Sequence, residues 1–282
     1  MSFKRSDIIK KALHCEGLFH VLSLMVLGLL ITSCGGTQLR NFFGTEVRAL
    51  PLEREENLSK KDFIDQLAYL SKELLANPDI KIRKISGASE KYLNEIYSRI
   101  VINNELLLNS ALRPTFYLIK HETPIIFSLP KAQFFISNSL IKKYIKSEEI
   151  MVAALTYQII KSHRNMYEKK AVVPTGVITL ERLMGMGRIQ LSDKNEIHKW
   201  AFLAMKRAGF DENAYLNWLQ TLNKGSIDFS LMVGDPSLLA REEFAFKSFM
   251  IKQKIKDSPD RIREYNSSAD FYKFINFVSG TI

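Results

Sequence analysis

Cysteine is nearly absent from this chain of 282 residues, which contains only Cys15 and Cys34. Both lie near the N-terminus, so the rest of the chain offers no thiol for a disulfide and must fold on its core alone. The sequence also lacks internal repeats, low-complexity tracts and a nucleic-acid-binding motif. These absences favour a single globular domain without a nucleic-acid partner, and 46% hydrophobic residues suffice for a sizeable core.

The first 33 residues have the pattern of a lipoprotein signal peptide. Four lysine or arginine residues occur among the first eleven, and residues 18–31 form an apolar run too short to span a bilayer comfortably. The run ends in Ile-Thr-Ser-Cys-Gly at 31–35, which resembles a bacterial lipobox. We expect Cys34 to become lipidated and N-terminal. A plain secretory signal, or an N-terminal anchor with a buried cysteine, is the alternative.

The expected mature protein is a lipid-anchored domain of a bacterial cell envelope. Residues 34–57 are polar and interrupted by glycine and proline, which predicts a tether, and residues 58–282 are predicted to form one domain. The residue after the cysteine is Gly35 and not an aspartate. This favours the outer membrane if the envelope has two membranes. The net charge of +10 fits either a basic face against anionic lipid headgroups or an ordinary solvated surface.

Hydrophobic periodicity predicts an α+β domain that is mostly helical. β-branched and aromatic runs at 114–120, 124–129 and 133–137 predict three strands. Apolar residues at helical spacing, preceded by capping residues, predict helices at 59–76, 89–107, 138–145, 147–167, 193–207, 211–222, 237–256 and 269–278. The stretch 172–190, which contains three glycines, gives no clear prediction.

Residues 150–163 (IMVAALTYQIIKSH), within the helix predicted at 147–167, have the frame of a zinc-peptidase helix without its zinc chemistry. An H-E-x-x-H helix places two imidazoles one turn apart to hold the metal, and a glutamate beside the first activates water. The best-fitting register puts Tyr157, Gln158 and Lys161 in these three places. Tyrosine is a poor zinc ligand, protonated lysine has no lone pair, and glutamine cannot take a proton from water.

Four segments together resemble the HtpX-like and BepA-like zinc metallopeptidases, a family of membrane-linked and periplasmic H-E-x-x-H peptidases. These segments are the strand pair at 127–137, the helix at 149–161, the element at 196–211 and Asp-Pro-Ser at 235–237. The resemblance implies a mostly helical, zincin-like metallopeptidase fold with a small sheet packed on the central helix. It also implies that a substrate lies extended along an edge strand near that helix.

Carried over by position, the family's zinc ligands fall on Tyr157, Lys161 and Glu196, and its general base falls on Gln158. Only Glu196 keeps a ligand residue, so we expect the zinc to be lost, no other cofactor to be bound, and no catalytic residue to remain. A shift of register by one residue gives a set that is equally inactive: Thr156, Tyr157 and Ile160.

Glu196 would need a partner in a closed interior, so we expect it to form an ion pair with Lys161 in place of the metal. The alternative is that both side chains reach solvent independently. A rebuilt zinc site in an active metalloendopeptidase also stays open, because His198 lies two residues after Glu196. His163 is expected on a polar face, pointing away from the former metal position, about 240° around the helix from Tyr157.

The predicted edge strand can recruit a peptide by strand addition without any chemistry. Its residues are Gln133, Phe134, Phe135, Ile136 and Ser137. Ordinary strand packing of the two phenylalanines is the alternative. Lys131-Ala132 replaces the family's double glycine before this strand, which indicates an altered turn.

We therefore expect a membrane-anchored, catalytically inactive protein that binds a protein or peptide partner in envelope protein assembly or quality control. A structural subunit of an envelope complex is a further alternative, since an aromatic C-terminal segment could either dock a partner helix or belong to the core. Its residues are Phe271, Tyr272, Phe274, Ile275 and Phe277.

Overall fold

The computed structural model describes residues 59–108, 111–168, 178–253 and 267–280, all within one unit, Leu52–Ile282. The elements follow the chain in the order α3 (Lys60–Ala76), β1 (Ile82–Lys84), α4 (Gly87–Ile102), β2 (Thr115–Ile119), β3 (Ile126–Leu129), β4 (Gln133–Ser137), α5 (Asn138–Lys143), α6 (Glu148–His163), α7 (Leu180–Met186), α8 (Leu191–Arg207), α9 (Asn213–Lys224), α10 (Ser230–Val233), α11 (Ser237–Lys252) and α12 (Ala269–Gly280). The predicted α+β class, mostly helical, is confirmed. The predicted signal peptide, Cys34 and the tether lie outside the described residues.

A mixed sheet of four strands has the order β1-β2-β4-β3, in which β4 runs parallel to β2 and antiparallel to β3. Alternation along β4 sends Phe134 and Ile136 into the core around α6, and Phe135 into a second core beneath α3 and α7. Phe135 stacks between Tyr117 and Phe127, with ring centroids 4.7 Å from each. Strands β3 and β4 are therefore buried on both faces.

Helix α6 is the central helix of the domain. The Ser147 side chain accepts a hydrogen bond from the backbone N–H of Ile150 at 3.4 Å, and two glutamates occupy the first turn. Buried side chains occur all around the helix, which packs against β3, α4, α8 and α9. The helix ends at His163, four residues before the predicted end at 167.

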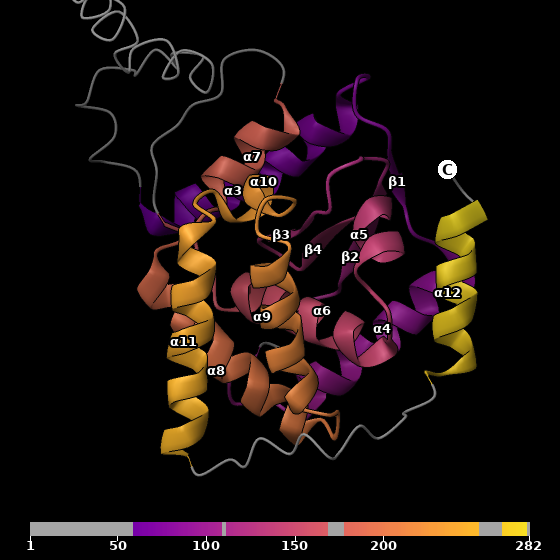
Figure 1. Cartoon of the computed structure of the whole chain (residues 1–282). Coiled ribbons are helices and arrows are strands. Elements are labelled where there is room, and N and C mark those ends of the chain that lie inside the picture. The colour runs from indigo at the N-terminus through magenta and orange to yellow at the C-terminus, as the bar shows by residue number, and fades with distance from the viewer. Residues whose placement is uncertain (1–58, 109–110, 169–177, 254–266, 281–282) are drawn as a thin grey trace, which may run out of the picture. The chain divides into compact units, whose positions relative to one another are not determined.

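The other helices surround this centre (Figure 1). Helix α3 lies against α7 and β3, while α8, α9 and α11 pack against one another on the far side of α6. Helix α12 packs on α4 and α5, and its Phe271 and Phe274 are buried, so these two rings are not available to a partner helix. Tyr272 of the same segment is exposed. Within the described ranges, no helix is both long enough and apolar enough to cross a membrane.

Several details differ from the sequence-based expectation. Helix α4 begins at Gly87 rather than Ser89, and the short elements β1, α7 and α10 were not predicted. The turn before β4 places Lys131 at φ 63° and Ala132 at φ 55°, the left-handed region that glycine favours. A glycine pair would fit this backbone, so the replacement by Lys131-Ala132 does not require the altered turn that we expected.

Candidate functional site

One small pocket collects the three positions of the degenerate motif. Tyr157, Gln158 and Lys161 line it, together with residues of β3, α7, α8, α9, α10, α11 and the α7–α8 connection. Its volume is about 70 Å³. The alternative register fails, because Thr156 and Ile160 are fully buried and do not line the pocket.

Gln158 ties the central helix to the outer edge of β3. Its Nε2 donates to the carbonyl of Ile126 at 3.3 Å, and its Oε1 accepts from the Ser128 hydroxyl at 3.0 Å. The Tyr167 hydroxyl donates to the next outward carbonyl, that of Ser128, at 3.2 Å. The residue in the place of a general base thus serves as a structural bridge, and an amide cannot accept the proton of a water.

Lys161 is a buried cation held by a backbone carbonyl. The residue is only 8% exposed, and its Nζ donates to the carbonyl of Gly187 at 2.6 Å. Burial, together with repulsion from Lys194, lowers the pKa of Lys161 to about 7. Within the described part of the chain, no carboxylate pairs with Lys161.

The predicted ion pair between Lys161 and Glu196 is wrong. Glu196 is exposed on α8, where its carboxylate accepts from Trp200 Nε1 at 3.1 Å. The rotation of α8 explains the difference, because its inward positions are Lys194 and His198, one turn apart, and Glu196 lies between them on the outer face. The single ligand-type residue that the resemblance retained is therefore not in the pocket.

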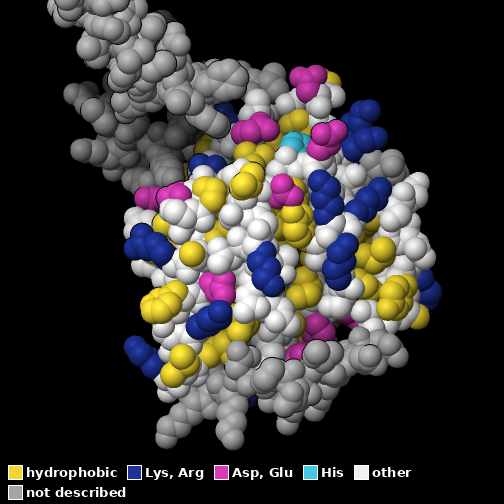
Figure 2. Space-filling view, in the orientation of Figure 1, with side chains coloured by type: hydrophobic (Ala, Val, Ile, Leu, Met, Phe, Trp, Pro, Cys, Tyr) yellow, Lys and Arg dark blue, Asp and Glu magenta, His cyan; other side chains and the backbone are white. Residues whose placement is uncertain are grey.

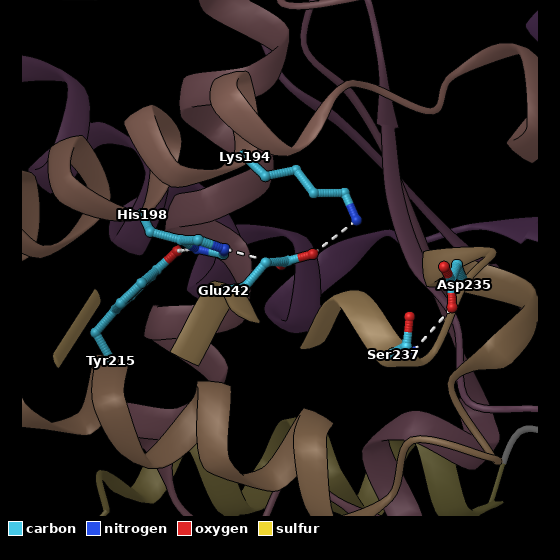
Figure 3. Close-up of polar contacts among 6 residues, drawn as sticks. All are labelled: Lys194, His198, Tyr215, Asp235, Ser237 and Glu242. Carbon is cyan, nitrogen blue, oxygen red and sulfur yellow. Dashed lines mark hydrogen bonds and ion pairs between the residues drawn. The ribbon is translucent and has the colours of Figure 1, made fainter. Parts of the chain in front are cut away.

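A buried polar network stands where the ion pair was expected (Figure 3). Lys194 Nζ and His198 Nε2 approach the two carboxylate oxygens of Glu242 from opposite sides, at 2.8 and 3.0 Å. The other ring nitrogen of His198 lies 2.8 Å from the hydroxyl of Tyr215. The network joins α8, α9 and α11, and both nitrogens of His198 are engaged in it.

The charge of Glu242 is fixed by its neighbours. Burial alone would raise its pKa, but the hydrogen bond and charge of His198, with the charge of Lys194, lower the pKa below its usual value. Burial and the charge of Glu242 raise the pKa of Tyr157, which stays a neutral phenol. The centroids of the Tyr157 and His198 rings are 5.2 Å apart. The lowered pKa of Glu242 means that its carboxyl group is ionised near neutral pH.

The predicted peptide-binding edge is also wrong. β4, which holds Gln133, Phe134, Phe135, Ile136 and Ser137, is an interior strand with partners on both sides, so it has no free edge. The edge strand beside the pocket is β3, which is itself buried. Local pairing of β3 with β4 was expected, but the distant parallel pairing with β2 covers the other side of β4.

The other two histidines among the described residues, His121 and His163, lie outside the pocket. His163 is buried rather than on a polar face, and its Nε2 lies 2.7 Å from the hydroxyl of Tyr97. Burial lowers the pKa of His163 to about 4. His121 accepts a backbone hydrogen bond from Thr123 in a connecting segment. As expected, His163 points away from the motif positions.

The side chains of the pocket do not suit a zinc ion. Lysines stand at two inward places, Lys161 and Lys194, and both nitrogens of His198 already have partners. In the described ranges, no group of three or more His, Cys, Asp or Glu is placed to hold a metal ion. A zinc ion here would have to displace a neighbouring ion pair and face two buried cations.

Comparison with known proteins does not assign the chain to a family. The sequence matches no protein-family model and no curated protein.

Sequence reasoning missed three members of the network: Lys194, Tyr215 and Glu242. The sequence contained a signal for two of them, because Tyr215 and Glu242 fall at positions on the apolar faces of their helices. Glu242 lies between Leu239 and Phe246, which are both buried. A carboxylate in an apolar stripe predicts a buried partner, although the identity of that partner depends on α8, far away in sequence.

Proposed function

We propose that this chain is a lipid-anchored, non-catalytic protein of a bacterial envelope, whose metallopeptidase-like domain binds a protein or peptide partner in envelope protein assembly or quality control. One observation carries the non-catalytic part of the proposal. In the pocket beside the central helix, the position of the family's general base carries the amide of Gln158, held in a structural bridge, and the two helix positions of its zinc ligands carry Tyr157 and Lys161.

A zincin-like fold is part of the same proposal. It is supported by a central helix whose motif positions face a pocket bordered by an edge strand, β3. It is also supported by Ser237 at the start of α11, since Asp-Pro-Ser was expected before a helix, and Asp235 Oδ1 accepts from the Ser237 N–H at 2.9 Å (Figure 3). Glu242, on this helix, lines the pocket.

The location rests on the N-terminal sequence. A basic segment, an apolar run and Cys34 occur in the order of a lipoprotein signal. Lysine and arginine side chains are spread over the face shown in Figure 2, which is compatible with a position near anionic headgroups. Outer-membrane attachment is proposed for an envelope with two membranes.

Zinc content tests the non-catalytic proposal. The full chain, purified in detergent, incubated with zinc and dialysed, is expected to retain less than about 0.1 zinc per molecule because its motif lacks ligands. Elemental analysis measures this, with an active H-E-x-x-H peptidase treated in parallel. Stoichiometric zinc that is lost in Glu196→Ala or His198→Ala would instead establish a rebuilt metal site and an active enzyme.

Two cysteine variants test the anchor. Cys34→Ser is expected to leave the protein without acylation, so the chain should fail to incorporate a labelled fatty acid in a bacterial host, whereas Cys15→Ser should incorporate it normally. Labelling of the purified protein, followed by membrane fractionation, measures this. Equal labelling of both variants would show that Cys34 is not the acylated residue.

A further inference from the structure

The pocket beside α6 contains more positive than negative charge. Three cationic side chains line it, Lys161, Arg188 and Lys194, against one carboxylate, Glu242. Glu242 is already paired with Lys194 at 2.8 Å. In the part of the chain that the structure describes, neither Lys161 nor Arg188 has a carboxylate partner. Lys161 is buried and Arg188 is partly exposed, and an anion supplied from outside would neutralise both side chains.

Unused donors point to the same conclusion. Lys161 donates to the carbonyl of Gly187, and its ammonium group lies over the Tyr167 ring, 5.1 Å from the centroid; an ammonium group has three N–H donors, so it can still donate to a ligand. The Nε of Arg188 is buried without a hydrogen-bond partner, although Nη2 of the same side chain donates to the carbonyl of Leu231 at 3.3 Å. Such buried donors are rarely left without acceptors, and a ligand oxygen would satisfy them.

The rest of the lining restricts the class of anion. Met184, Ile189, Trp218 and Val233 contribute apolar walls, and the cavity of about 70 Å³ has room for a small group only. Tyr157, Arg188 and Met232 of the lining keep partial exposure to solvent. A fully hydrated, multiply charged anion would lose its solvation against the apolar walls, whereas a singly charged carboxylate on a short apolar chain suits both parts.

We propose that this pocket binds a carboxylate carried on a small apolar group, with Lys161 and Arg188 as the residues that bind the anion. Two sources share this chemistry: a short free organic acid, and the C-terminal carboxylate of a peptide that ends in a small apolar residue. The inference deepens the proposed function, and it rests on that proposal only in taking the pocket to be free of metal.

Fluorescence provides a direct test, because Trp218 lines the pocket and the only other tryptophan is Trp200. In the full chain carrying Trp200→Phe, isobutyrate is expected to change the emission of Trp218 in a saturable way. Isobutyramide, which has nearly the same shape without the charge, should bind at least about tenfold more weakly. Lys161→Met and Arg188→Gln should each weaken isobutyrate binding by at least about tenfold, whereas Lys199→Met, an exposed lysine of α8, should not.

The source is distinguished by a peptide pair, Ala-Ala-Val with a free or an amidated C-terminus. Tighter binding of the free peptide than of isobutyrate assigns the site to peptide ends, and the reverse order assigns it to free acids. The proposal is overturned if isobutyramide binds as well as isobutyrate, if Lys161→Met keeps full affinity, or if no carboxylate saturates the signal by about 50 mM. Protein of measured zinc content is used throughout. Stoichiometric zinc refutes the proposed function, whereas zinc-free protein that binds no carboxylate refutes this inference alone.

Discussion

Glu242→Gln is expected to lower the free energy of unfolding by about 3–5 kcal/mol, the usual cost of breaking a buried ion pair from one side. Glu242 is 3% exposed and neutralises Lys194, which is 8% exposed. Glutamine keeps the size of the side chain but not its charge, so Lys194 would remain as a buried cation without a counter-ion. Urea denaturation of the full-length wild type and variant in the same buffer, monitored by circular dichroism, measures the difference.

The adjacent residue supplies a matched control. Glu243 is only partly buried and pairs with Lys247, whose side chain is 45% exposed, so Glu243→Gln should cost less than about 1 kcal/mol. The effect of Glu242→Gln should also shrink in acid. Because the pKa of Glu242 is lowered in the folded state, its contribution is complete above the usual glutamate pKa and is lost as pH falls through the lowered value. Equal costs for both variants near neutral pH would contradict the role assigned to Glu242.

Local sequence signals predicted most elements of this domain, because each depends on nearby residues. Ser147 before α6 and the aromatic pattern of β4 are sufficient to place those two elements. The interior position of β4 could not be obtained in the same way, since its parallel pairing with β2 joins segments that are not consecutive strands. The assignment of β4 as an edge came from the resemblance, not from the residues of the strand.

The apolar periodicity of the α8 sequence indicates which face of this helix points inward. Ile197, Ala201 and Met205 recur every four residues and are all buried, which defines the inner face of the helix. His198 lies beside this stripe, whereas Glu196 lies outside it. Giving precedence to an aligned glutamate over the apolar periodicity led to the wrong partner for Lys161. Local periodicity is physical evidence about which side chains face inward, and a weak motif alignment is not.

Lys161→Met is expected to raise the free energy of unfolding by about 1–3 kcal/mol near pH 6. The pKa of Lys161 is lowered from 10.5 to about 7, which corresponds to a cost of at most about 5 kcal/mol for keeping the buried side chain charged. Methionine fills similar space without that cost. The gain is reduced because the carbonyl of Gly187 loses its donor, which costs about 1–3 kcal/mol.

The pH dependence separates this explanation from simple repacking. Below about pH 7 the lysine is charged in both the folded and unfolded states, so the wild-type protein bears the full cost of burying the charge. Between about pH 7 and 10.5 only the unfolded state holds the proton, so the free energy of unfolding of the wild type rises with pH. The advantage of Lys161→Met should therefore disappear by about pH 10, whereas Lys199→Met should change stability by less than about 0.5 kcal/mol at every pH. Denaturant titrations at several pH values measure both variants.

A loss of stability for Lys161→Met near pH 6 would show that the lysine holds the fold together. A gain there, combined with the loss of carboxylate binding, would mean that Lys161 costs the domain stability and contributes to ligand recognition instead. Stability that is given up at a binding site is common in proteins, because groups arranged for a ligand are not arranged for the lowest energy of the free fold. The two measurements on one variant thus decide whether the pocket is a relic filled by structural side chains or a site maintained for an anion.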